Sequence, residues 1–87
     1  MTALTIHGVT LTPKELAEVL ALAPDVPAKM SDDAILAAIG SVLDAHNDNL
    51  TACVADLAWE YFEHPDVMAA RMCRCLAFTS RLAGVTP

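Results

Sequence analysis

The sequence predicts an all-α protein: a small bundle of about four helices with a short extended or β-hairpin segment at its N-terminus. Two observations support this fold class. The chain is 55% hydrophobic and only 18% charged, so it has enough apolar side chains to form a core. Apolar residues also recur at helical spacing in four stretches, separated by prolines or helix-start signals. At 87 residues we expect one domain, a single helical unit covering 1–87.

The N-terminal segment, residues 1–11, alternates apolar and polar side chains on either side of His7 and Gly8. Many of its residues are β-branched, which favours extended backbone. We therefore expect a strand or a short hairpin that turns at His7 and Gly8.

The first helix is expected at about 13–23. The Thr12 hydroxyl can accept a hydrogen bond from the backbone N–H of Glu15, and Pro13 suits the first helical position because its missing N–H costs nothing there. The helix should stop before Pro24. We expect its inward side chains to be Leu16, Val19, Leu20 and Ala23.

The second helix is expected at about 32–46. Ser31 can cap it, and Asp32 and Asp33 in its first turn are favourable against the helix dipole. At about 100° per residue, one face collects the apolar side chains together with a histidine. This face comprises Ile35, Leu36, Ile39, Val42, Leu43 and His46.

The third and fourth helices are expected at about 50–63 and 65–83. The residues Asn-Asp-Asn after position 46 favour a break before the third helix, although one continuous helix through 32–63 remains an alternative. Pro65 separates the last two helices, and Gly84 is a typical helix terminator.

Charge is divided unevenly along the chain. Residues 1–66 hold all eleven acidic residues and two lysines, a net charge of −9, while residues 67–87 hold three arginines and no acid, a net of +3; together they give −6. An acidic body disfavours nucleic acid as the main partner, because binding nucleic acid depends on neutralising phosphates.

The sequence has no apolar run long enough for a membrane span and no signal-peptide pattern, and its number of cysteines is odd. We therefore expect a cytoplasmic protein with reduced thiols and no membrane partner.

The last helix carries what we call the arginine stripe. Its members fall within an arc of about 80° on a helical projection, and an aromatic residue among arginines is typical of protein-binding surfaces. We therefore predict that the stripe contacts a protein partner through Arg71, Arg74, Phe78 and Arg81.

The third helix offers an alternative explanation of the stripe. It carries an acidic strip, and in an antiparallel hairpin Glu60 would lie level with Arg71 and Asp56 with Arg74, so that the two charged strips would pair. Both interpretations remain open.

The third and fourth helices are also apolar or small on two or three faces, one of which includes Trp59. This is more apolar surface than a four-helix monomer needs to bury, so we expect self-association.

No catalytic, cofactor or metal site is expected. Cys73 and Cys75 point about 200° apart on a helix, so they cannot share a metal ion or form a disulfide, and Cys75 is expected in the core. His46 is expected to be partly buried on the apolar face of its helix rather than a zinc ligand. The sequence has no nucleophile elbow, phosphate-binding loop or dinucleotide fingerprint, so we expect no enzyme.

The stretch LTPKELAEVLAL, residues 11–22, resembles the first helix of helix-turn-helix regulators. Those proteins continue with a tight turn and a polar recognition helix, whereas here Pro-Asp-Val-Pro follows and the next helix opens with two aspartates.

Taken together, these features predict a small acidic helical protein–protein interaction module, an adaptor, assembly factor or inhibitor, that binds itself and another protein. The alternative is a nucleic-acid-associated regulator that uses the arginine stripe or the helix-turn-helix-like segment.

Overall fold

The computed structural model describes residues 3–82. Its elements are, in chain order, β1 (Leu4–Ile6), β2 (Val9–Leu11), α1 (Pro13–Leu20), α2 (Asp32–Ala45), α3 (Leu50–Glu63) and α4 (Pro65–Leu82). The predicted fold class, a small helical bundle with an N-terminal hairpin, is confirmed. The helix α1 ends before the predicted boundary at residue 23, and the predicted terminator Gly84 lies outside the described residues.

The two strands form an antiparallel hairpin. Leu4 pairs with Leu11, and Ile6 pairs with Val9. The turn between them has positive φ angles, 53° at His7 and 78° at the following glycine, as a two-residue hairpin turn requires. Leu11 is fully buried, so the hairpin adds one side to the core.

Side-chain caps begin the first three helices as the sequence indicates. At α1 the capping box is complete: the Thr12 hydroxyl accepts from the Glu15 N–H at 3.2 Å, and a Glu15 carboxylate oxygen accepts from the Thr12 N–H at 2.9 Å. Ser31 accepts from the Ala34 N–H at the start of α2, at 3.2 Å. These contacts are local, so each helix start is set within a few residues.

The helices α2 and α3 are separate, so the continuous-helix alternative is wrong. Asn47 and Asp48 have φ angles of 55° and 56°, in the left-handed region that ends a right-handed helix. The Asn49 side chain then accepts from the N–H of Ala52 at 3.1 Å and caps α3.

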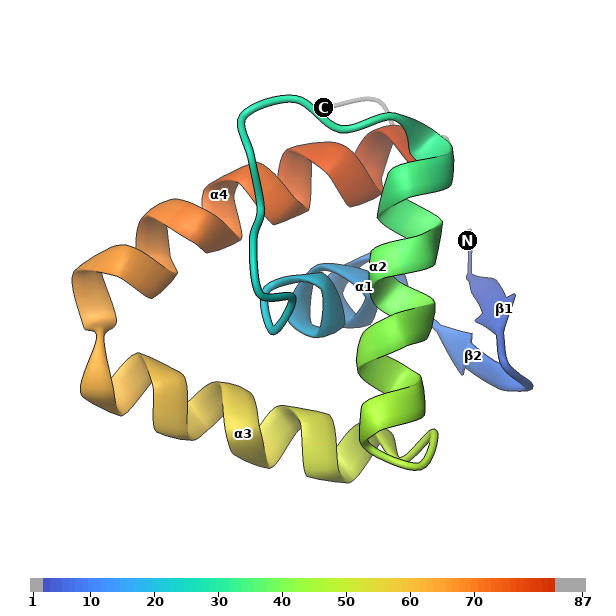
Figure 1. The fold of residues 1–87 in the computed structure, drawn as a ribbon, viewed down its shortest axis with the longest axis horizontal. Coiled ribbons are helices and arrows are strands. Elements are labelled where there is room, and N and C mark those ends of the chain that lie inside the picture. The colour runs from blue at the N-terminus through green and yellow to red at the C-terminus, as the bar shows by residue number, and fades with distance from the viewer. Residues whose placement is uncertain (1–2, 83–87) are drawn as a thin grey trace.

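The other three described helices surround α1. In Figure 1, α3 and α4 diverge from a shared corner, α2 crosses their open end, and α1 is seen nearly end-on between them. The helix α1 contacts each of the other three helices. Its inward residues are buried as predicted, and the largest fully buried side chains of the core are Leu11, Leu16, Leu20, Ile35, Ile39 and Leu43.

The helix α4 is turned about its axis relative to the sequence prediction. Phe78, expected in the arginine stripe, is only 7% exposed, while Leu76, next to the core residue Cys75, is 42% exposed. Around the helix, Cys75 and Thr79 lie between these two residues, and both are fully buried. The rotation brings the arginine side of α4 against the segment that joins α1 to α2, residues 21–31, which we call the α1–α2 loop.

Candidate functional site

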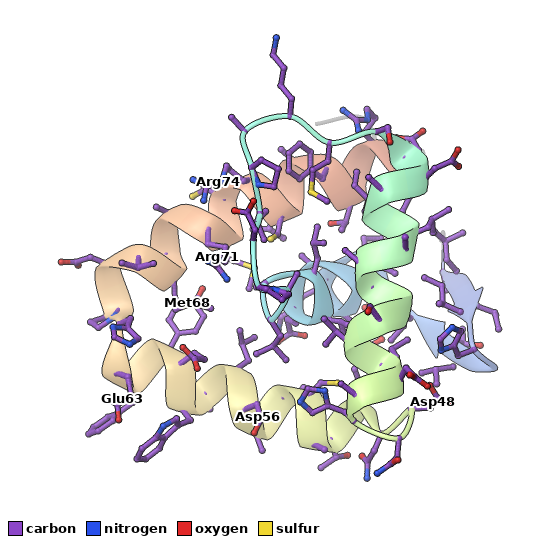
Figure 2. All side chains as sticks on the ribbon, in the orientation of Figure 1. Asp48, Asp56, Glu63, Met68, Arg71 and Arg74 are labelled. Carbon is purple, nitrogen blue, oxygen red and sulfur yellow. The ribbon has the colours of Figure 1, made fainter. Side chains whose placement is uncertain are left out.

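The arginine stripe binds the chain's own α1–α2 loop. Arg71 Nη1 donates hydrogen bonds to the carbonyl oxygens of Ala21, at 3.2 Å, and Ala23, at 2.9 Å. These carbonyls follow the last turn of α1, where carbonyl groups lack helical partners and the helix dipole favours a cation. Arg71 therefore acts as a side-chain cap for the C-terminal end of α1, and Figure 2 shows it reaching from α4 toward that end.

The other two arginines bind the loop further along. Arg74 Nε donates to the Val26 carbonyl at 3.1 Å. Arg81 Nη2 donates to the Met30 carbonyl at 3.0 Å and forms an ion pair with Asp32 at 3.1 Å. The Arg81 guanidinium also lies 5.7 Å from the centre of the Phe78 ring, within cation–π range. The stripe thus holds the loop along its whole length.

The structure therefore brings the four predicted site residues together, but against the loop. The predicted pairing of Arg71 with Glu60 and of Arg74 with Asp56 is wrong: among the described residues neither arginine forms an ion pair with an acid. The guanidinium groups of Arg71 and Arg74 donate hydrogen bonds to loop carbonyls instead. Binding of a partner by the stripe stays a prediction, and the ring of Phe78 is already covered within the chain.

Asp56 of the acidic strip contacts the end of α2. Its carboxylate lies 2.5 Å from His46 Nε2, and His46 Nδ1 lies 2.8 Å from the Val42 carbonyl oxygen. Both ring nitrogens face acceptors, so the doubly protonated ring fits best. The Val42 carbonyl and, next, Asp56 raise the pKa of His46 above its ordinary value, although partial burial opposes them.

The most exposed apolar surface is on α3, on the side turned away from the core. We call it the α3 outer face, formed by Val54, Ala55, Ala58, Trp59 and Phe62. Trp59 is 60% exposed, Phe62 77% and Val54 41%. The two aromatic rings contact each other, with centroids 5.7 Å apart. These positions span about 140° of the helix without a charged residue.

Two cavities lie beside the C-terminal end of α1. Cavity A has a volume of about 200 Å³ and lies between that end and the corner of α3 and α4; it is lined by Ala21, Leu22, Ala23, Pro24, Glu60, Met68 and Arg71. Cavity B, of about 210 Å³, lies against α2 and is lined by Leu22, Pro24, Ser41, Val42, Ala45 and His46. Leu22 and Pro24 line both, so the two cavities are neighbours. We call the pair the α1-end groove.

One polar atom at this groove lacks a partner. Arg71 Nε is buried, and within residues 3–82 no group accepts a hydrogen bond from it. A buried donor without an acceptor costs roughly 1 to 3 kcal/mol. The Arg71 side chain is therefore held by its Nη1 contacts alone, at the wall of cavity A.

Cys75 lies in the core, as the sequence predicts. Cys75 is fully buried, and burial raises the pKa of its thiol to about 11, with Arg71 and Arg74 opposing the shift. Cys53 is also buried, whereas Cys73 is exposed. Across residues 3–82, no three side chains of His, Cys, Asp or Glu gather as a metal site would need. In the same part of the chain, no helix has the length and apolar character to span a bilayer.

Comparison with known proteins gives no assignment: no protein-family model, curated protein or solved structure matches the chain. Functional inference therefore depends on three features of the molecule. They are the loop held by the arginine stripe, the α3 outer face and the α1-end groove.

Proposed function

We propose that this protein is a non-enzymatic protein–protein interaction module that self-associates through the α3 outer face. The observation that carries the proposal is the exposure of Trp59 and Phe62, side by side on one helix. Fully burying a large apolar side chain is worth about 1.5 to 3 kcal/mol relative to leaving it in water. Two adjacent aromatic side chains form the kind of anchor on which interfaces depend.

A second copy of the chain is the partner that suits this face best. In a two-fold symmetric dimer the same patch lies on both sides of the contact, so it must be compatible with itself. The α3 outer face meets this condition because it is apolar and uncharged. The rest of the molecule meets it poorly, because a net charge of −6 makes most self-contacts repulsive.

The geometry of α3 supports a helix-to-helix contact of modest strength. Its 14 residues extend about 21 Å, long enough to lie along the α3 helix of a second copy. One helix face supplies less than the roughly 800 Å² that each partner contributes to a standard interface. We therefore expect a dissociation constant in the micromolar range.

Sedimentation velocity over a concentration series tests this proposal. The wild type should shift from monomer to dimer between roughly 1 and 100 μM. The variant Trp59→Ser/Phe62→Ser should remain monomeric throughout, while the control Leu36→Ser, which removes an apolar side chain 37% exposed on α2, should dimerise like the wild type. Trp59 is the only tryptophan, so its fluorescence emission should move to shorter wavelength as the dimer forms.

Two results would contradict the proposal. A wild type that stays monomeric up to about 0.5 mM would rule out self-association at this face. A dimer that survives Trp59→Ser/Phe62→Ser and is lost with Leu36→Ser would place the contact on α2 instead.

A further inference from the structure

The α1-end groove combines two small cavities with acidic side chains. Cavities A and B, of about 200 and 210 Å³, are each below the roughly 300 Å³ at which small-molecule pockets begin. Each has the size for an apolar side chain rather than for a whole metabolite. Because Leu22 and Pro24 form the wall between them, two side chains of one chain segment can enter them together.

The walls of the groove are apolar with few polar groups. Cavity A is walled by α1–α2 loop residues 21–24 and Met68, and cavity B by Val42 and Ala45 of α2. The polar side chains at these walls are few, and the two basic ones are already in contact with other groups. Arg71 is bonded to loop carbonyls, and His46 lies between Val42 and Asp56.

Carboxylates accompany both cavities. Glu60 lines cavity A, and Asp56 contacts His46 at the wall of cavity B, with its carboxylate side chain 62% exposed. Asp25 is exposed next to Pro24, the residue shared by both cavities. Figure 2 shows Asp56 on α3 and Arg71 on α4, on opposite sides of the space around the end of α1. Arg71 is the one arginine or lysine at these walls, and its Nη1 is committed to the loop.

We propose that the α1-end groove binds a basic peptide segment of another protein, one that places two apolar side chains in cavities A and B and lysine or arginine near Glu60, Asp56 and Asp25. Charge complementarity favours this occupant, because Glu60, Asp56 and Asp25 outnumber the two cations at the groove, Arg71 and His46, and the chain as a whole has a net charge of −6. The site is separate from the α3 outer face and does not depend on the proposed dimer. If the protein dimerises through the α3 outer face, each copy in the dimer could still bind one peptide segment in its α1-end groove.

A library of random dodecapeptides displayed on phage is the probe for this site. The library is selected on immobilised wild-type protein, and the recovered peptides are synthesised and their affinities measured by fluorescence anisotropy. We expect the selected peptides to contain two or more apolar residues together with lysine or arginine. Their affinity should fall as salt concentration rises, as for any contact between exposed opposite charges.

Matched variants assign the binding to the groove. Ser41→Trp fills cavity B from an exposed helix position and should weaken binding by at least about tenfold, because one apolar side chain loses its cavity. Ala45→Leu fills the same cavity with a smaller group and provides a second test if the tryptophan variant is unstable. Glu60→Gln should weaken binding roughly twofold to fivefold, and Asp33→Asn, an equal charge change on a different surface, should leave it unchanged.

The opposite results would overturn this inference. Peptides that bind Ser41→Trp and Ala45→Leu as tightly as the wild type, or a selected set without basic residues, would show that the groove is not the binding site. Selection that enriches no peptide would overturn it as well. Sedimentation of Ser41→Trp separates the two proposals, because filling the groove should leave the monomer–dimer equilibrium unchanged.

Discussion

The two helices of the α3–α4 hairpin contain similar kinds of residues, but their aromatic side chains differ in exposure. Each is a long helix with apolar or small residues on several faces and a strip of charges of one sign. In α4 the aromatic residue nearest the charges, Phe78, is 7% exposed; in α3 the aromatic residue Phe62 is 77% exposed. Apolar content alone therefore does not determine which aromatic side chain enters the core.

The difference follows from the kind of hydrogen bond that each charged strip can make. Arginine side chains only donate, and ionised carboxylates only accept. The α1–α2 loop, which contains two prolines and no regular structure, presents carbonyl oxygens at Ala21, Ala23, Val26 and Met30. These acceptors suit α4 and offer nothing to the acids of α3. The loop therefore covers the arginine side of α4, where Phe78 is buried, and leaves the aromatic side chains of α3 in solvent.

The largest expected effect compares the two phenylalanines. Phe78→Ala should lower the free energy of unfolding by about 3 to 5 kcal/mol, because it leaves a cavity in the core. Phe62→Ala should change it by less than about 0.5 kcal/mol, because the ring is largely in water. Urea denaturation followed by circular dichroism measures both values.

These unfolding measurements are made at low protein concentration, where dimerisation does not contribute to stability. Equal losses for Phe78→Ala and Phe62→Ala would contradict the assignment of one ring to the core and the other to the surface. A loss at Phe62 that appears only at high concentration would instead support the α3 outer face as the dimer contact.

A smaller effect is expected within the arginine stripe. Arg71→Met keeps an apolar stem but removes two hydrogen bonds at the end of α1, each worth about 1.5 to 3 kcal/mol for a charged donor. It also removes the unpartnered Nε and its cost, so the net loss in the free energy of unfolding should be about 2 kcal/mol. Arg74→Met removes one bond from an exposed side chain and should cost less than about 1 kcal/mol. Thermal unfolding ranks the two, and because both variants remove one positive charge, the change in net charge cancels in the comparison. The capping role of Arg71 fails if the two variants are equally stable.

Local signals explain how much of the fold the sequence could predict. The helix starts depend on contacts three residues apart, such as Thr12 with Glu15 and Ser31 with Ala34. The hairpin turn at His7 and the break after residue 46 depend on backbone preferences of single residues. Signals of this range are contained in the sequence itself, so those features could be predicted.

The role of the arginine stripe could not be predicted in the same way. The bonds from Arg71, Arg74 and Arg81 to the loop carbonyls join residues 48 to 51 positions apart. A helical projection shows which side chains share a face, but it does not show which backbone groups come near that face. It therefore grouped Phe78 with the arginines, but it did not show that the Phe78 ring is buried while Arg74 and Arg81 stay exposed.

The α3 outer face and the α1-end groove also differ in how far the sequence could predict them. The apolar character of α3 around Trp59 was visible in its periodicity, although its exposure depends on where the loop runs. The α1-end groove had no signal in the sequence, because cavities A and B take their walls from α2, α3, α4 and the α1–α2 loop. A groove assembled from four segments exists only once the chain has folded.

The smallest expected effect concerns the link between α2 and α3 and is visible as a pH dependence. The raised pKa of His46 in the folded protein, caused first by the Val42 carbonyl and then by Asp56, means that folding stabilises the protonated ring. This contribution is fully present below the unfolded value of about 6.5 and is lost as the pH rises through the folded pKa. The loss should be under about 1 kcal/mol, because Asp56 is largely exposed.

Urea denaturation between about pH 5.5 and pH 8 measures this dependence, with His46→Gln as the test variant. The fall in stability above about pH 6.5 should be absent from His46→Gln and reduced in Asp56→Asn, which keeps the Val42 contact. His7 also lies 3.2 Å from an acid, Asp48, on an exposed surface, so His7→Gln serves as the matched control and should retain the dependence. If His7→Gln removes the dependence and His46→Gln does not, the hairpin, and not the junction of α2 with α3, is the part of the fold that responds to pH.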